Sequence, residues 1–217
     1  MYNVAIIGAG PAGIFTALEL TKLKPDWKIV LIEKGQKIEK RICPIREGQK
    51  KCLSCKTCGL LCGWGGAGAF SDGKLSLSYE VGGDLPSLIG EDFAQELINY
   101  ADKIYLEFGA DEHVEGLGNT EEVKEIRKRA IQAGLQLVDC PIRHMGTDKA
   151  QDIYLSIERY LQNNGVEIYF GTECLNLIFE GEKCVGIKAT DRKQEFDIFA
   201  NSTIVATGRR GADWLEK

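Results

Sequence analysis

The sequence predicts a doubly wound α/β fold, built on a parallel sheet from βαβ units. Two short apolar runs, residues 4–7 and 29–32, have the length and composition of buried parallel strands. Between them, apolar residues from Ile14 to Leu20 recur at helical spacing. Strand, helix and strand in this order form the first βαβ unit, and further strand-like segments follow in the last third of the chain.

A glycine-rich turn separates the first strand from the helix. Gly8, Gly10 and Gly13 have G-x-G-x-x-G spacing, and Glu33 ends the second strand roughly 20 residues later. The first glycine permits a tight turn, the second lets a pyrophosphate approach the backbone, and the third lets helix and strand pack closely. Pro11 suits the first helical turn, whose free N–H groups attract phosphates, and Glu33 can accept hydrogen bonds from a ribose. The motif predicts a dinucleotide site in a Rossmann-like fold, with a purely structural turn as the alternative.

The composition is that of an ordinary globular chain of 217 residues with 44% hydrophobic content, enough for a sizeable core. The net charge of −5 comes from interspersed acids and bases, so we expect neither a nucleic-acid partner nor a membrane partner. Glycines interrupt the first apolar run, which argues against a signal peptide, and no run approaches 18 apolar residues. We therefore expect a cytoplasmic protein, in which eight cysteines indicate metal or redox chemistry rather than disulfides.

The middle of the chain separates two parts of the predicted nucleotide-binding core. Helices are predicted over residues 91–108, 120–133 and 148–161, and strands over 135–143, 166–170, 173–180, 183–190, 195–199 and 203–206. The strand at 166–170 is the expected third parallel strand of the sheet. More than a hundred residues precede it after the second strand, so residues 41–149 are predicted to be an insertion between core segments 1–40 and 150–217. An insertion of this size favours a bulky isoalloxazine ring as the part to be covered.

A basic segment follows the second strand, over residues 34–51. It is either a solvated loop or a source of cations that contact the pyrophosphate, with Lys40 and Arg41 as the first candidates.

Several motifs resemble the FAD domain of glutathione-reductase-like flavoproteins: the turn at 8–13, Glu33-Lys34, the hairpin at 173–190 and Ala206-Thr207-Gly208. Cys43-Pro44, the glycine-rich stretch 65–74 and the RHMGTD motif at 143–148 are similar to a family of uncharacterised bacterial FAD-dependent dehydrogenases. The resemblance implies FAD, with ribose on Glu33, adenine beside Cys174, and flavin near 65–74 and 206–208. It implies hydride or electron transfer to an undefined small-molecule substrate or electron carrier, with NAD(P)H as a candidate electron donor. Members of that family extend beyond Lys217, which predicts that this chain is their N-terminal portion.

The candidate site residues follow from these motifs. Asp72 is either a polar turn residue or a ligand of ribityl or flavin oxygens, and His144 is either a turn residue or a proton donor. No catalytic residue is assigned. The predicted cofactor-binding residues are Gly8, Gly10, Pro11, Ala12, Gly13, Glu33, Lys34, Lys40, Arg41, Gly65, Gly66, Ala67, Asp72, Cys174, Ala206, Thr207 and Gly208.

A cysteine cluster adds a second candidate centre. Cys52, Cys55, Cys58 and Cys62 have the C-x2-C-x2-C-x3-C spacing of bacterial [4Fe–4S] ferredoxins, and Cys43 could supply a remote ligand. The alternatives are a structural Zn²⁺, a redox dithiol of Cys55 with Cys58, and cysteines that only pack. The predicted function is that of an FAD-dependent oxidoreductase, and the alternative is a nucleotide-binding or zinc-binding module without turnover.

Overall fold

The computed structural model describes residues 1–46, 48, 51–118 and 120–216. They form two compact units, the first of residues Met1–Ser71 with Tyr154–Lys217 and the second of residues Asp72–Ile153. The first unit carries the large sheet, and the second is mainly helical. None of the helices in the described part of the chain is long and apolar enough to cross a bilayer.

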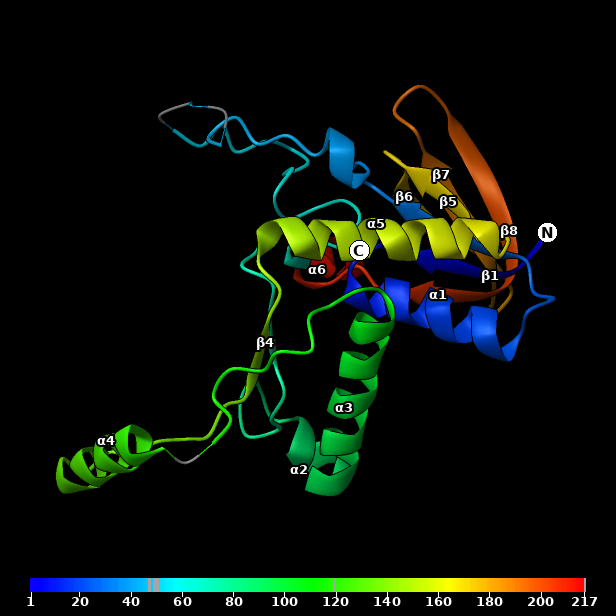
Figure 1. Ribbon diagram of the computed structural model, residues 1–217. Helices are drawn as coiled ribbons and strands as arrows, with labels where there is room; N and C mark the ends of the chain where they lie inside the picture. The colour runs from blue at the N-terminus through cyan, green and yellow to red at the C-terminus, as the bar shows by residue number, and fades with distance from the viewer. Residues whose placement is uncertain (47, 49–50, 119, 217) are drawn as a thin grey trace. The chain divides into compact units, whose positions relative to one another are not determined.

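The sheet of the first unit has six strands within the described residues, in the order β5-β2-β1-β8-β7-β6 (Figure 1). β1 (Tyr2–Ile7), β2 (Ile29–Glu33) and β5 (Glu167–Phe170) are parallel neighbours. β6 (Glu173–Glu180) and β7 (Lys183–Thr190) form an antiparallel meander with the first half of β8 (Glu195–Val205). The predicted fold class and the third parallel strand are both confirmed.

β8 replaces the two separate strands predicted at 195–199 and 203–206. Its first half pairs antiparallel with β7, and its second half pairs parallel with β1, through Ser202 opposite Val4 for example. Asn201 and Ser202 are exposed, whereas Ile198 and Ala200 are buried, so the polar pair lies on an open part of a continuous strand. The prediction of a break here was wrong because polar residues that resemble a turn also suit an exposed strand position.

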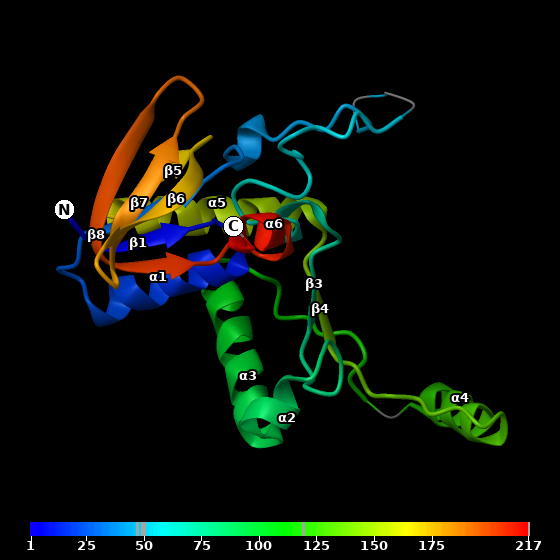
Figure 2. The ribbon, with the colours of Figure 1, turned by 180° about the vertical axis from the view of Figure 1, so that it is seen from behind.

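The two faces of the sheet are covered differently. α1 (Pro11–Leu23) and the later part of α5 (Thr147–Asn163) lie on the same face, as the two opposite views agree (Figures 1 and 2). On the other face, Ala5, Ile7, Val30 and Ile32 form a buried cluster with five residues of the meander: Cys174, Ile187, Ala189, Ile198 and Ala200. Because side chains alternate along a strand, the apolar runs of β1 and β2 serve both faces. This burial holds the carboxyl ends of β1 and β2 side by side.

Short elements complete the first unit. The 3₁₀ turns are η1 (Ile38–Lys40), η2 (Gly68–Phe70) and η3 (Arg209–Gly211), and η3 leads directly into the one-turn helix α6 (Ala212–Leu215). None of the three 3₁₀ turns was predicted, because stretches of three residues have no detectable periodicity.

The second unit contains β3 (Lys74–Ser76), β4 (Ile142–His144), α2 (Leu85–Ile89), α3 (Glu91–Glu107) and α4 (Glu121–Gln132). The predicted helices are confirmed, and the Thr120 hydroxyl caps α4 by accepting a hydrogen bond from the amide of Val123. The strand predicted over 135–143 is reduced to β4, which pairs with β3 over three residues. Leu135 and Val138 are exposed, so their apolar character did not mark a buried strand.

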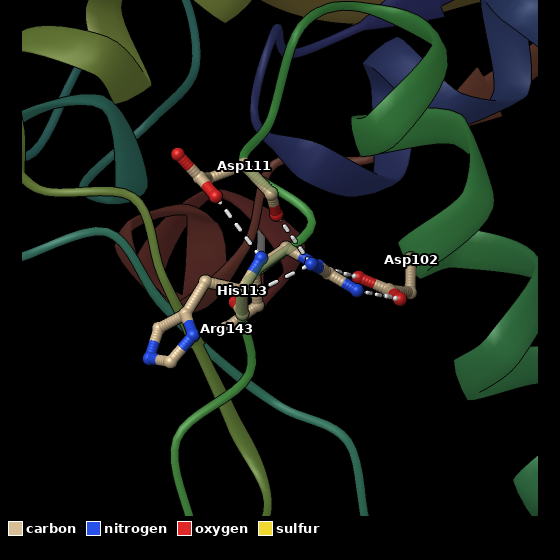
Figure 3. A network of polar contacts seen from close by, with 4 residues as sticks. All are labelled: Asp102, Asp111, His113 and Arg143. Carbon is tan, nitrogen blue, oxygen red and sulfur yellow. Dashed lines mark hydrogen bonds and ion pairs between the residues drawn. The ribbon is translucent and has the colours of Figure 1, made fainter.

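A buried ion pair joins three segments of the second unit (Figure 3). The Arg143 guanidinium on β4 donates from Nε to Asp102 Oδ1 at 2.6 Å and from Nη2 to Oδ2 at 2.8 Å. Its Nη1 also donates to the backbone carbonyls of Asp111 and His113. The hydrogen bonds to Asp102 raise the pKa of Arg143 above its ordinary value. The charged Arg143 side chain therefore ties α3, β4 and the 111–113 loop together.

Candidate functional site

The glycine turn between β1 and α1 has the geometry that its motif predicts. Gly8 has a φ of +106°, and a Cβ there would lie 2.5 Å from the carbonyl oxygen of Ala206. A Cβ at Gly13 would lie 1.9 Å from the Gly8 oxygen, so the helix could not pack against the turn. Gly10 differs, because its backbone is extended and no atom lies within 4 Å of the position that a Cβ would take. The space at Gly10 is thus open, while Gly8 and Gly13 serve close packing.

A cavity of about 510 Å³ lies beside this turn. Its walls come from the glycine turn, the glycine-rich run at 61–67 and the loop at 206–210 that follows β8. Parallel strands bring their carboxyl ends to one edge of a sheet, which is where such folds bind ligands. The predicted cofactor-binding residues in its walls are Gly8, Gly10, Pro11, Glu33, Lys34, Gly66, Ala67, Ala206, Thr207 and Gly208.

The glycine-rich run is held directly against the turn. The Gly65 amide donates to the Ala9 carbonyl at 2.9 Å. A Cβ on Gly66 would come within 3.3 Å of the Gly10 Cα, so a side chain here would narrow the cavity. Gly65 itself sits against Tyr154 and does not line the cavity.

Glu33 organises the site through its buried carboxylate, since the residue is only 6% exposed. Oε2 accepts a hydrogen bond from the Ala9 amide at 2.9 Å, and Oε1 accepts from the amides of Gly35 and Gly63 at 2.8 and 2.9 Å. These bonds join the glycine turn, the end of β2 and the 61–67 run. An ionised carboxylate has about four acceptor positions, so these three bonds are compatible with one more from a ribose hydroxyl.

A smaller cavity of about 80 Å³ adjoins the first and shares Gly8, Glu33, Lys34, Thr207 and Arg210 with it. Cys174, predicted to lie beside an adenine, lines this second cavity together with Trp214. The Trp214 indole donates to the Leu175 carbonyl at 3.0 Å, which places α6 against the start of β6. The two cavities together offer a wide space next to the glycine turn and a smaller end of mixed polarity between β2, β6 and α6.

Arg41 has a structural role that the sequence did not indicate. Its buried guanidinium donates to the carbonyls of Gly59, Leu60 and Trp64 at 2.7 to 2.9 Å and lies 4.3 Å from the centre of the Phe70 ring. Burial lowers its pKa to about 10. Arg41 therefore shapes the turn that leads into the glycine-rich run, and it does not line the cavity beside Gly10. Of the basic segment predicted at 34–51, residues 47, 49 and 50 lie outside the described residues.

Besides Arg41, Gly13, Gly65 and Cys174, three more predicted residues lie outside that cavity. Lys40 lines a separate cavity with Arg41, and Ala12 lies in the first turn of α1. Asp72 belongs to the second unit, where it accepts from Lys74 at 2.7 Å and contacts His144 at 3.3 Å. These two partners lower the pKa of Asp72.

Two arginines in the cavity wall were not predicted. Arg209 and Arg210 follow the strand-end sequence Ala206-Thr207-Gly208 and, with Lys34, give the cavity three cationic side chains. Lys34 donates to the Arg210 carbonyl at 3.4 Å. The available signal was a basic pair directly after a strand that ends at the nucleotide edge of the sheet.

The predicted cysteine centre does not come together in the structure. Among the described residues, no three His, Cys, Asp or Glu side chains are placed to hold a metal ion. Cys52 and Cys55 are exposed, Cys43 and Cys58 are half-buried, and Cys62 is buried in the wall of the cavity beside Gly10. Burial raises the pKa of the Cys62 thiol. This arrangement does not fit an iron–sulfur cluster or a four-cysteine zinc site.

Cys174 is expected to resist alkylation in the folded protein. Burial raises its pKa to about 12 from the ordinary 9.0, so at pH 8 it has about a thousandfold less thiolate than an ordinary thiol. A timed iodoacetamide reaction followed by peptide mass spectrometry should modify Cys55 rapidly and Cys174 only after unfolding. Equal rates in the folded protein would contradict the buried position. Because the folded state retains the proton, stability should be unchanged below pH 9 and fall between about pH 9 and 12.

The structure is that of a doubly wound α/β protein with a glycine-lined cavity beside its first βα turn, and comparison with known proteins identifies its family. A family profile described as FAD binding domain matches residues 94–217, more than half of the chain. The chain therefore belongs to the FAD binding domain family.

Similar solved structures share the fold. They include glycine oxidase from Bacillus cereus (16% identity, TM-score 0.54), with a match that covers 100% of this chain and 58% of that one. Thermovibrio ammonificans THI4 has 13% identity and a TM-score of 0.53 over 97% of this chain and 59% of its own. A 3-ketosteroid-delta4-(5alpha)-dehydrogenase from Rhodococcus jostii has 14% identity and a TM-score of 0.56 over 94% of this chain and 45% of its own.

One curated relative shares more of its sequence over a shorter stretch. An uncharacterized protein from Clostridium beijerinckii is 39% identical over 71 residues, which are 33% of this chain and 13% of that protein. The present chain thus spans less than two thirds of the proteins it resembles.

Proposed function

We propose that the chain binds FAD with its pyrophosphate in the open space at Gly10, and that it is the cofactor-binding part of an FAD-dependent oxidoreductase. One observation carries this proposal. The middle glycine of the motif faces empty space in a cavity of about 510 Å³, while the other two glycines are packed against backbone. The φ of −79° at Gly10 is open to any residue, so the turn conformation alone does not explain a glycine here. Membership of the FAD binding domain family supports the same cofactor.

The charges around the cavity suit a diphosphate. The N-terminus of α1 presents backbone N–H groups and the positive end of the helix dipole to the turn. Lys34, Arg209 and Arg210 add three cations to the cavity wall. The negative charge of Glu33 is directed at three backbone amides rather than left unpaired beside the phosphates.

The ADP half of the cofactor can be assigned to the two adjoining cavities at Glu33. We propose that the ribose donates to Glu33 Oε2 and that the adenine occupies the small cavity beside Cys174 and Trp214. The flavin would then extend past Gly66, Ala67 and Thr207. When bound, FAD supplies the capacity for hydride or electron transfer. The residues of this chain would bind it, orient it and keep water from its pyrophosphate.

The proposed reaction partners are a small-molecule substrate or electron carrier, with NAD(P)H as the candidate electron donor. Similar folds in glycine oxidase and in a ketosteroid dehydrogenase support an oxidoreductase class. We also propose that residues 1–40 and 150–217 form the nucleotide-binding core of a longer protein of the bacterial dehydrogenase group, with residues 41–149 inserted. No electron path through an iron–sulfur cluster is included, because the described cysteines do not converge.

Ligand selectivity tests the proposal. The purified protein should retain FAD at one molecule per chain, show the visible bands of oxidised flavin, and lose them on reduction by dithionite. ADP should compete for the site, whereas FMN, which lacks the AMP moiety, should not be retained. Binding of ADP without any retention of FAD would instead indicate a nucleotide-binding module without redox function. Retention of FMN as strong as that of FAD would contradict the assignment of the adenosine cavity.

A further inference from the structure

A third cavity, with a volume of about 720 Å³, is not used by the proposed function. Its walls come from residues 34–42, from the cysteine loop at 55–62, and from the meander strands β6 and β7 with the turn that follows β7. All of these belong to the first unit. The glycine turn does not contribute to it. It shares Lys34 and Cys62 with the cavity beside Gly10, and Lys34 and Glu173 with the small cavity beside Cys174.

The walls of this cavity are strongly cationic. Five basic side chains line it: Lys34, Lys40, Arg41, Lys56 and Arg192. Within the described residues, Glu173 is the one acid in its lining. The Arg41 guanidinium is already bound by three carbonyls and contributes its charge rather than a free donor. Lys40, Lys56 and Arg192 are therefore the cations that belong to this cavity alone and can contact a ligand directly.

Arg192 is held in an unusual conformation at this place. Its φ is +74°, a region that side-chain-bearing residues rarely adopt. The Arg192 amide donates to Thr190 Oγ1 at 3.1 Å, and its Nη2 donates across the cavity wall to Thr57 Oγ1 at 2.9 Å. The second bond ties the β7–β8 turn to the cysteine loop. Both described non-glycine residues with positive φ, Ser54 and Arg192, lie in or next to the loops that form these walls.

We propose that this cavity binds a small phosphate-bearing ligand that is separate from the FAD. Asp191 Oδ1 accepts from the amides of Lys193 and Gln194, so the hairpin turn itself fixes Arg192 and holds its guanidinium at the cavity wall. Five cations against one acid among the described residues of the lining make the cavity suited to an anion. Guanidinium and ammonium groups bind phosphate through charge-assisted hydrogen bonds, and the Thr57 hydroxyl, which accepts from Arg192, still has a hydrogen to donate. Lys34 lines both this cavity and the cavity beside Gly10, so the two ligands would share one cation.

Calorimetric titration of the FAD-loaded protein with inorganic pyrophosphate tests the proposal. Saturable binding of one pyrophosphate per chain is expected, weakening as salt is added. Arg192→Gly removes the guanidinium and keeps a residue suited to the positive φ, so the turn should fold while affinity falls about tenfold. Lys40→Gln should weaken binding severalfold. Lys188→Gln is the matched control, because Lys188 lies on the same strand pair but is bonded to Asp197 at 2.8 Å outside the cavity.

Absence of saturable binding, or equal affinity of the Arg192→Gly and control proteins, would overturn the proposal. Release of FAD by pyrophosphate at the same concentrations would also overturn it, because the cavity would then be part of the cofactor site. If the protein retains no FAD at all, the same titration of a Gly10→Leu variant, with the glycine turn blocked, still reports on this cavity alone. The failure of the FAD assignment is thereby separated from the failure of this one.

Cysteine protection provides a second readout that does not depend on the variants. Cys55 lines the cavity, whereas Cys52 is exposed outside it. Pyrophosphate should slow the carboxymethylation of Cys55 by iodoacetate and leave that of Cys52 unchanged. Equal rates at Cys55 with and without saturating pyrophosphate would place the ligand elsewhere.

Discussion

Replacement of Gly10 by leucine is expected to abolish FAD retention and leave the fold intact. The backbone at Gly10 is extended, and no atom lies within 4 Å of the Cβ position, so the side chain enters the cavity without strain. It would then occupy the space of the pyrophosphate and cover the amides at the start of α1. Loss of these charge-assisted contacts should weaken FAD binding by at least about a hundredfold, measured by equilibrium dialysis and flavin absorbance.

Two controls separate this effect from misfolding. Glu182→Leu adds the same apolar side chain at an exposed turn of the same unit and should retain FAD fully. Gly13→Ala should instead destabilise the fold, because its Cβ would lie 1.9 Å from the Gly8 oxygen. Circular dichroism should therefore show a native fold for Gly10→Leu and a reduced thermal midpoint for Gly13→Ala. Full FAD retention by a folded Gly10→Leu protein would show that the pyrophosphate does not bind at this turn.

Replacement of Arg143 by methionine is expected to lower the free energy of unfolding of the second unit by about 3–5 kcal/mol. The Arg143 and Asp102 side chains are 5% and 14% exposed, so the variant leaves a nearly buried carboxylate without its partner. It also leaves the carbonyls of Asp111 and His113 without their donor (Figure 3). All three tryptophans lie in the first unit, so tryptophan fluorescence would not report on the second unit. Amide hydrogen exchange over α3 and β4 is therefore the suitable measurement.

A matched arginine of the same unit provides the control. Arg129 pairs with Glu125 at 3.8 Å on the exposed surface of α4, and Arg129→Met should cost less than about 1 kcal/mol. The double variant Arg143→Met with Asp102→Leu removes the uncompensated charge and should recover part of the lost protection. Similar exchange rates for the Arg143 and Arg129 variants would show that the buried pair contributes no more than a surface contact.

The parts of the site that the sequence predicted are those determined by local rules. Gly8, Gly10, Gly13 and Glu33 have roles that depend on turn geometry, helix dipole and strand ends, all of which lie within one βαβ unit. Glu33 shows the limit of this reasoning. Its bonds to the amides of Ala9 and Gly35 are local, but its bond to Gly63 depends on how a distant loop folds back.

The residues that were missed depend on tertiary packing. A basic residue such as Arg41 has the same sequence signal whether it contacts a phosphate or the three carbonyls that it binds here. Cysteine spacing likewise allows a metal site without requiring one, because the thiols must also converge in space. Arg209 and Arg210 directly follow the predicted residues Ala206-Thr207-Gly208, but their position in the cavity wall depends on the turn of η3, which has no sequence signal.

A crystal structure of the protein with FAD tests the proposed cofactor site most directly. We expect diphosphate density against the backbone amides in the first turn of α1, between Gly10 and Gly66, with the adenine end toward Cys174. Density for the dinucleotide at another surface, or a cavity beside Gly10 filled by the side chains of Arg209 and Arg210 in the presence of saturating FAD, would contradict the assignment.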